Sequence, residues 1–373
     1  MSDAPVTLSQ VAREAGVSLA TASRAINGSA TRSVREDLRE RVLETARRLD
    51  YSPDPSAQAM ARGRTTALGL VVHDIADPYF STIAAGVARA AEREGLIVTL
   101  ASTEHSPERE LAFVELARRQ RSRAIILAGG RLAPTDPQQP RSAVGIEIGS
   151  SMDRSRGGLP TSDALEAALN AFQDAGGGVA LIGQPVGDLP VVEIANADGA
   201  ADLARALHGL GYRRCAVLAG PPGHHTAADR TEGFAGELAE LGSPVLSGDV
   251  LTCAFTRDGG YDAMRGMIEQ AAAASDGREG MPELVFAVND VMAVGAMAAV
   301  RDAGLSVPDD VAVAGFDDIH TLRDVSPGLT TVRIPLAEVG ALATDLALGR
   351  SAEARSQVRG EVVLRDSTPK LTR

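Results

Sequence analysis

Polar side chains that could bind a ligand follow several β-like runs of this 373-residue sequence. Asn289 and Asp317 each come within three residues of the end of an apolar run, and Arg230 lies shortly beyond another. The aromatic pair Tyr79 and Phe80 follows the first run. Carboxylates accept hydrogen bonds and the planar guanidinium donates them. Because open parallel sheets bind ligands beyond the carboxyl ends of their strands, these residues predict one site for a polar ligand.

Two of these residues also fit other roles. Asp317, next to Asp318, has the residue type and position of a helix N-cap. Arg230 could form a surface ion pair.

The sequence lacks the patterns of common catalytic and cofactor sites. It has no Gly-x-Ser-x-Gly elbow, no glycine-rich dinucleotide motif after the first strand, and no Walker loop. His224 and His225 lack a third ligand, so a solvent or cleft position is favoured over a metal site. Cys215 and Cys253 are expected to be buried free thiols. We predict a binding protein without cofactor or metal, and an α/β enzyme without a recognisable motif is an alternative.

Alternating elements define the fold class of the body. From residue 67, β-like runs alternate with helical stretches, which is typical of parallel sheets covered by helices. The predicted strands are 67–73, 96–101, 123–128, 178–183, 191–194, 214–219, 245–251, 284–288, 311–316 and 330–333. The helices between them include 79–94, 107–120, 200–210, 230–241, 259–274 and 291–303. Residues 134–161, rich in Gly, Pro, Ser and Arg, are predicted to be a surface insertion.

Three short helices are predicted before residue 52. Thr7 and Gln10 have the spacing of a capping box, and Gly16 fits the turn after the first helix. Ser18 caps a second helix with a polar outer face, and a third helix begins near residue 34 or two residues later. Two helices joined by a tight glycine turn are typical of a helix-turn-helix. A helical bundle that binds no nucleic acid has the same spacing.

The charge is unevenly distributed along the chain. The first 64 residues hold 10 arginines and 8 acidic residues, a formal charge of +2. The remainder carries −14, so the chain totals −12. A slightly basic head on an acidic body is compatible with a head that contacts a phosphate backbone.

A short hinge separates the head from the body. Asp54 and Pro55 fit the N-cap and first position of a helix, and Gly63 fits the position after its end. About two helical turns are too few to be stable alone in water, so this hinge helix needs support.

The head closely resembles the DNA-binding domain of the LacI/GalR family of bacterial transcription regulators. The resemblance is carried by TLSQVA at 7–12, AGVS at 15–18 and ATASRAING at 20–28. It implies that base edges in the major groove are contacted by Leu19, Ala20 and Arg24. It also implies that phosphates are contacted by Thr7, Thr21, Ser23 and Asn27. For Ser23 and Asn27 the alternative is a solvent-facing helix surface.

The same resemblance assigns two hinge residues to the minor groove. Ala57 and Met60 lie one helical turn apart, and Met60 occupies the position that opens a base step. The family usually has leucine there. The alternative is that Met60 fills a gap in a linker.

The body is similar to the two-lobed, periplasmic-binding-protein-like sensor of that family, in LGYRR at 210–214 and AVNDVMA at 287–293. The resemblance implies that the effector is bound by Tyr79, Phe80, Asp198, Arg230, Phe255, Asn289 and Asp317. A sugar suits this set because its hydroxyls both donate and accept. The family often has Gln where Ile334 stands here, so a close copy of the usual ligand is not expected.

The whole chain is thus predicted to be α/β, with an all-α helix-turn-helix head, a hinge helix and a two-lobed body. The predicted domains are the head at 1–52, the hinge at 53–66 and the effector domain at 67–373. Its lobes are about 67–211 with 331–354, and about 212–330 with 355–373.

The predicted function is repression of transcription by a homodimer that binds double-stranded operator DNA under control of a small carbohydrate effector. The chain has no leucine heptad extension, which favours a dimer over a tetramer. The N-terminus lacks a signal sequence and the longest apolar run has ten residues, so we expect a cytoplasmic protein without a membrane partner. A sugar-binding transport component is the alternative, but it would have a signal sequence and no helix-turn-helix.

Replacing Arg24 with alanine tests base readout. Arginine donates two parallel hydrogen bonds to O6 and N7 of guanine. We therefore expect Arg24→Ala to weaken operator binding by roughly 1–3 kcal/mol and to relax the preference at one base position. Selection of bound sequences from random DNA measures both effects. A uniform loss across all sequences would make Arg24 a phosphate contact.

Overall fold

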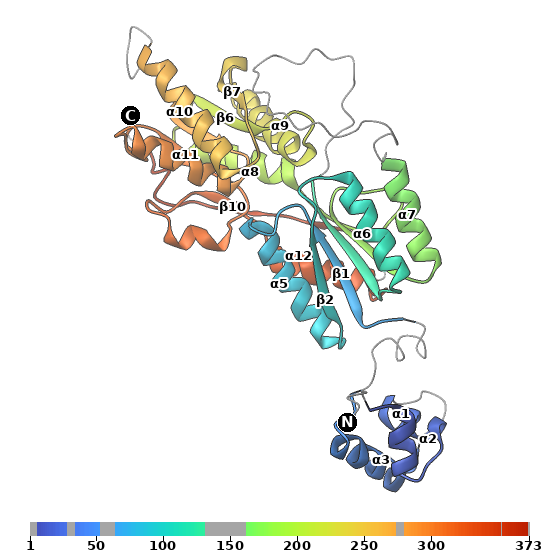
Figure 1. The fold of residues 1–373 in the computed structure, drawn as a ribbon. Helices are drawn as coiled ribbons and strands as arrows, with labels where there is room; N and C mark the ends of the chain where they lie inside the picture. Colours follow the sequence, from blue (N-terminus) through green and yellow to red (C-terminus); the bar gives the residue numbers. More distant parts are fainter. Residues whose placement is uncertain are drawn as a thin grey trace, which may run out of the picture. The chain divides into compact units, whose positions relative to one another are not determined.

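The computed structural model describes residues 6–27, 34–52, 64–130, 162–273, 280–351 and 353–371. They form two compact units, of which the first holds the residues up to Thr66 with Gln120–Arg123 and the second holds the rest (Figure 1). The hinge residues Ala57 and Met60 and the predicted insertion 134–161 lie outside the described residues. None of the helices in the described ranges is long and apolar enough to span a membrane.

The N-terminal unit contains α1 (Leu8–Glu14), α2 (Leu19–Asn27) and α3 (Glu36–Arg48). The predicted capping box of α1 is confirmed, since the Thr7 hydroxyl accepts from the Gln10 amide and the Gln10 side chain accepts from the Thr7 amide at 2.7 Å. α3 begins at the later of its two predicted starts. Small apolar residues from all three helices form the core, namely Val11, Ala12, Ala15, Ala22, Ala25, Val42 and Ala46.

The second unit begins with a lobe built on a six-stranded parallel sheet, which we call the N-lobe. Its strand order is β11-β5-β4-β3-β1-β2. The strands are β1 (Ala67–Val72), β2 (Ile97–Ser102), β3 (Ala124–Gly129), β4 (Gly178–Gly183), β5 (Val191–Ile194) and β11 (Arg355–Val358). The helices are α5 (Pro78–Arg93), α6 (Pro107–Arg119), α7 (Ser162–Asp174) and α12 (Leu336–Ala347).

Helices cover both faces of the N-lobe sheet (Figure 1). Leu70 and Ile126 belong to the core with α5 and α12, whereas their neighbours Val71 and Ile125 belong to the core with α6 and α7. Successive residues of a strand point to opposite faces, so β1 and β3 are apolar throughout because both faces are buried.

The second lobe, the C-lobe, has a four-stranded parallel sheet in the order β7-β6-β8-β9. Its strands are β6 (Cys215–Gly220), β7 (Val250–Thr252), β8 (Leu284–Ala287) and β9 (Ala312–Ala314). Its helices are α8 (Asn196–Gly209), α9 (His225–Glu240), α10 (Arg257–Ala273) and α11 (Asp290–Asp302), with short 3-10 turns η1 (Ser247–Asp249) and η3 (His320–Asp324). Phe234 of α9 stacks on Phe286 of β8 with 4.4 Å between ring centroids. Of the two free cysteines, Cys215 is buried and Cys253 is half-buried.

The chain crosses between the lobes after β5, after β10 (Thr331–Arg333) and after β11. β10 pairs antiparallel with β12 (Glu361–Val363). Two elements differ from the predicted lobe boundaries. α8 packs along α9 of the C-lobe, where Arg205 and Glu237 pair at 2.8 Å, and β11 joins the edge of the N-lobe sheet beside β5. Amphipathic patterning predicts a buried face but not which sheet covers it.

α5 and α12 approach each other closely through two glycines. A Cβ atom at Gly86 would lie well inside van der Waals contact with the carbonyl oxygen of Ala337, and one at Gly340 would meet the carbonyl oxygen of Ile83 in the same way. The two backbones can therefore touch only because neither position carries a side chain. This contact holds α12, the helix that follows the second crossover, on the N-lobe sheet.

Alanine at two helical glycines should have opposite effects on stability. Gly86→Ala should lower the free energy of unfolding by about 1–3 kcal/mol, because the added methyl group forces the helices apart. Gly236→Ala should raise it by roughly 0.5–1 kcal/mol, because Gly236 is exposed on α9 with no atom near its Cβ position and alanine is the better helix former. Urea unfolding of both variants measures the difference. Equal changes would contradict the close approach of α5 and α12.

Candidate functional site

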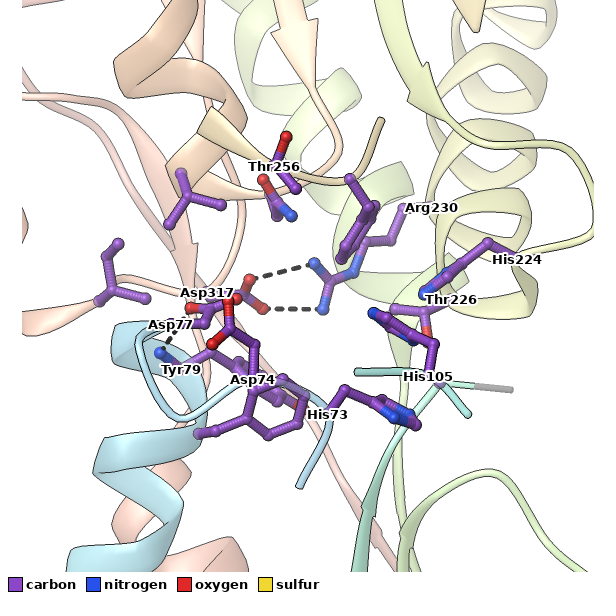
Figure 2. Close-up of a pocket in the computed structure, with 16 residues that line it drawn as sticks. His73, Asp74, Asp77, Tyr79, His105, His224, Thr226, Arg230, Thr256 and Asp317 are labelled. Atoms are coloured by element: carbon purple, nitrogen blue, oxygen red, sulfur yellow. Dashed lines mark hydrogen bonds and ion pairs between the residues drawn. The ribbon is translucent and has the colours of Figure 1, made fainter. Parts of the chain in front are cut away.

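A cleft lies where the strand ends of the two lobes face each other (Figure 2). Every strand of both parallel sheets from β1 to β9, except β4 and β5, contributes a residue from the segment that follows its carboxyl end. The cleft is lined by His73, Asp74, Asp77, Tyr79, Phe80, His105, Gly130, His224, Thr226, Arg230, Phe255, Thr256, Asn289, Val291, Asp317 and Ile319. This is the position at which open α/β sheets bind ligands.

Six of the seven residues predicted to bind the effector line this cleft, and they are Tyr79, Phe80, Arg230, Phe255, Asn289 and Asp317. Asp198 is not among the lining residues. Its carboxylate accepts a hydrogen bond from Arg359 at 2.9 Å, and its side chain is half exposed. Asn196, two positions earlier on α8, bonds to Arg230 instead. Residues two apart on a helix point in nearly opposite directions, so the two side chains cannot share the cleft.

Arg230 and Asp317 form a buried ion pair at the centre of the cleft (Figure 2). The side chains are 2% and 6% exposed. Nη2 of Arg230 donates to Oδ1 of Asp317 at 2.7 Å and Nη1 donates to Oδ2 at 3.2 Å, a bidentate arrangement. Burial excludes the alternative of a surface pair for Arg230.

Other groups complete the environment of the guanidinium. Nε of Arg230 donates to Oδ1 of Asn196 at 2.8 Å, and Nη1 donates to the carbonyl oxygen of Val288 at 2.7 Å. The guanidinium carbon lies 3.9 Å from the ring centroid of Phe316, a cation–π contact. Three segments that are distant in sequence therefore meet on the side chain of Arg230.

The loop that carries Asp317 has a constrained backbone. Asp317 and Asp318 have φ values of 120° and 54°, which non-glycine residues seldom adopt. Asp318 forms ion pairs with Arg333 at 2.7 Å and Arg365 at 2.6 Å. These contacts, rather than a helix N-cap at Asp317, account for the acidic pair.

The buried carboxylate of Asp290 holds the same loop through hydrogen bonds. One of its carboxylate oxygens accepts from the amide of Ile319 at 2.9 Å, and the other accepts from the hydroxyl of Thr331 at 2.7 Å. Asp290 thus connects the start of α11, the Asp317 loop and the crossover strand β10.

Burial and charge shift the pKa values of the acids in and under the cleft. Burial, opposed by Arg230, raises the pKa of Asp317 to about 6. Burial and the neighbouring charge of Asp317 raise the pKa of Asp290 to about 7. Burial also raises the pKa of Asp77 and of the Tyr79 hydroxyl.

A row of stacked rings crosses the cleft from lobe to lobe. His73 stacks on His105 at 4.1 Å, His105 meets His224 edge-on at 6.2 Å, and His224 stacks on Phe255 at 4.4 Å between centroids. The first two rings follow β1 and β2 of the N-lobe, and the last two follow β6 and β7 of the C-lobe. From the sequence, His224 was predicted to be either a solvent-exposed or a cleft residue, and His73 and His105 were not identified. The available signal was the position of all three just after strands.

The residues of the head predicted to contact DNA lie on α2, except Thr7, which caps α1. Leu19 and Ala20 are exposed and Arg24 is half-buried. A 52% exposed leucine at the start of a helix is available for an apolar contact. Thr7 is exposed, and Thr21, Ser23 and Asn27 are half-buried, while the core of the head is formed by Ala22 and Ala25 of the same helix. Ser18 caps α2, since its hydroxyl accepts from the amide of Thr21 at 3.1 Å.

A helix-turn-helix head followed by a two-lobed body with a polar cleft defines a class of ligand-controlled DNA-binding proteins. Residues 7–54 match the family described as bacterial regulatory proteins, lacI family, and residues 204–368 match the periplasmic binding protein-like domain. The transcriptional regulator GalS of Salmonella typhimurium is 32% identical over 345 residues, which cover 92% of this chain and 89% of GalS. The chain belongs to the LacI family and is a DNA-binding transcription regulator, as its relatives are, and not an enzyme.

Solved structures agree with this assignment. A complex of the transcriptional regulator CelR with cellobiose has a TM-score of 0.62 at 27% identity and covers 97% of this chain and 99% of its own. The lac repressor dimer bound to operator and the anti-inducer ONPF has a TM-score of 0.75 at 23% identity, covering 98% of this chain and 100% of its own, which shows a shared fold. The predicted family and fold class are confirmed.

The raised pKa of Asp290 predicts how stability depends on pH. A carboxyl group whose pKa rises on folding, here from 3.8 to about 7, binds more protons in the folded than in the unfolded state between those values. Its contribution to stability is therefore lost as the pH rises through that window. Asp290→Asn keeps an acceptor for Ile319 but cannot titrate. We expect the free energy of unfolding of the parent protein to fall more steeply than that of the variant between about pH 4 and pH 7.

Denaturant unfolding at several pH values measures this difference. The lowered pKa values of His105 and His224 act equally in both proteins and cancel in the comparison. Parallel curves for the two proteins would show that Asp290 is charged throughout.

Proposed function

We propose that this protein is a homodimeric repressor whose operator affinity is set by a small carbohydrate bound in the cleft. The observation that carries the proposal is the buried Arg230–Asp317 pair in a cleft lined from both lobes, in a chain whose head is a helix-turn-helix. Such a regulator acts where its DNA is, in the cytoplasm.

The side chains of the cleft favour a hydroxylated ring. Asp74, Asp77 and Asp317 supply acceptors, and Arg230 and Thr256 supply donors. Phe255 is half-buried and lines the cleft, and its ring, on which His224 stacks from one side, would pack against the apolar face of a pyranose. The bound cellobiose of the similar CelR structure supports the same ligand class.

Two copies of the head would read two half-sites. The recognition helix is α2, and a two-fold dimer places two such helices on successive major grooves of a near-palindromic operator. β2 is the edge strand of the N-lobe sheet and exposes the apolar side chains of Ile97 and Leu100, which a second copy could cover.

Ligand and DNA would be coupled through the lobes. An effector held by residues of both lobes would restrict the orientation of one lobe relative to the other. The three crossovers connect the lobes and would carry this change between them. If the two orientations pair differently in the dimer, effector and operator change each other's affinity by the same factor. Induction and corepression differ only in which orientation the effector favours.

Selection of bound sequences from random DNA, repeated with a panel of free sugars, tests the proposal. We expect one operator sequence with two-fold symmetry and at least one sugar that changes its affinity. Absence of sequence-specific binding at any salt concentration would contradict the DNA-binding role, and a dimer unresponsive to every sugar would contradict the carbohydrate effector.

Phe255→Ala should separate effector binding from DNA binding. Loss of the ring should weaken the active sugar by about tenfold or more, equivalent to about 1.4 kcal/mol, with operator affinity unchanged in its absence. Tyr261→Ala is a matched control, because Tyr261 is a half-buried aromatic residue of α10 that does not line the cleft. Calorimetric titration with the sugar measures both variants, and equal losses would argue against stacking on Phe255.

A further inference from the structure

We propose that the cleft selects uncharged effectors and excludes anionic ones, so that a free sugar or glycoside binds and its phosphate ester or sugar acid does not. This inference rests on the proposed function, since it concerns the ligand class of the same cleft. It is carried by the charges of the lining residues and by the state of the helix ends around them.

Among the residues that the structure describes, Arg230 is the only arginine or lysine that lines the cleft, and its charge is balanced by Asp317. Arg230 donates to both carboxylate oxygens of Asp317, to Asn196 and to a backbone carbonyl. These bonds use four of its five N–H groups, leaving one on Nη2. An anion that binds the guanidinium of Arg230 through two hydrogen bonds would have to displace Asp317 from its buried ion pair with Arg230. A hydroxyl group needs only the single remaining donor.

Two further carboxylates give the cleft an excess of negative charge. Asp74 accepts from the amide of Ala76 at 2.8 Å. Asp77 accepts from the amide of Tyr79 at 2.9 Å (Figure 2). Within the described part of the chain, neither forms an ion pair with a basic side chain. With Asp317 balanced by Arg230, the formal charge left on the lining is that of Asp74 and Asp77. An anion entering the cleft meets both charges. Asp77 is half-buried and Asp74 is exposed, so water screens the charge of Asp77 less than that of Asp74.

The histidines do not compensate for this charge. Nδ1 of His224 accepts from the amide of Ala227 at 3.3 Å, which places the ring proton on Nε2 of a neutral imidazole. Burial lowers the pKa of His224 to about 4 and also lowers the pKa of His105. Nδ1 of His73 lies 3.8 Å from the Glu110 carboxylate, so any positive charge on this ring is balanced locally.

The helix N-termini at the cleft are partly occupied by side-chain caps. A phosphate binds a helix N-terminus through free backbone N–H groups. Here α5, α9 and α11 are capped by lining side chains, namely Asp77, His224 and Asn289. At the start of α10 the hydroxyl of Thr256, another lining residue, accepts from the amide of Gly259 at 3.1 Å. Four helices therefore begin at the cleft, and at each of them a side chain already occupies one of the first backbone amides.

The neighbouring outer groove adds no positive charge. It shares Asp74, Asp77 and Phe255 with the cleft and extends along Arg257 and Asp258. Arg257 pairs with Asp258 at 3.0 Å, so this extension is neutral overall.

Matched pairs of free and phosphorylated sugars test the inference on the full-length chain. The probes are glucose with glucose 6-phosphate, galactose with galactose 6-phosphate, and ribose with ribose 5-phosphate, together with cellobiose and gluconate. Dissociation constants are measured by calorimetry near neutral pH. We expect at least one uncharged probe to bind and its anionic counterpart to bind more weakly by about tenfold or more.

Neutralising the carboxylates should reduce the discrimination. Asp74→Asn and Asp77→Asn keep an oxygen that can accept from Ala76 and Tyr79, so the loop and the α5 cap can form as before. In the double variant, the ratio of the dissociation constant of the anionic probe to that of its uncharged counterpart should fall by about tenfold. A tenfold change corresponds to about 1.4 kcal/mol. Asp202→Asn, which removes a surface carboxylate paired with Arg205, should leave the ratio unchanged.

Different failures have different meanings. A phosphate ester or gluconate that binds as tightly as the uncharged probes would overturn the charge selection while leaving the effector cleft intact. An unchanged ratio in the double variant would overturn the assignment to Asp74 and Asp77. If no probe binds and none alters operator affinity, it is the proposed carbohydrate effector that fails.

Discussion

The buried pair of Arg230 and Asp317 is the interaction on which the architecture of the cleft depends. Removing two charges from water costs several kcal/mol per ion, and only a complete set of hydrogen bonds offsets that cost. The structure supplies this set from α9, the end of β8, the loop after β9 and the start of α8. The pair therefore determines where these four segments lie, and it leaves the guanidinium suited to a hydroxyl group rather than to a second anion.

The same pair connects the ligand site with the connections between the lobes. Asp317 lies in a loop with left-handed backbone that Asp290 ties to Thr331 of the crossover strand. That strand leads into α12, which packs against α5 of the N-lobe through glycine contacts. A ligand that shifts Asp317 therefore acts on a short and tightly packed path to the other lobe. A path of this kind suits a protein in which ligand binding must alter the relation between two lobes.

Local patterns predicted most of the elements, and the family resemblance named seven effector residues, of which six line the cleft. The Thr7–Gln10 capping box is formed as expected because it depends on residues three positions apart. Asn289 and Asp317 line the cleft because parallel strands deliver their following residues to one edge. Asp198 does not, because α8 begins early enough that its helical phase turns Asn196 rather than Asp198 toward Arg230. β11 was missed because a short half-exposed edge strand has little apolar patterning.

The sequence by itself determined the alternation of helices and strands up to β10, the family, and the residues that follow the strand ends, because these depend on local periodicity and motifs. Only the tertiary structure decided the charge of the cleft. Arg230 bonds to residues 34 and 87 positions away, and His73 and His224 join one row of rings from different lobes. Whether a charged side chain is neutralised or available to a ligand depends on such distant partners, which no local pattern specifies.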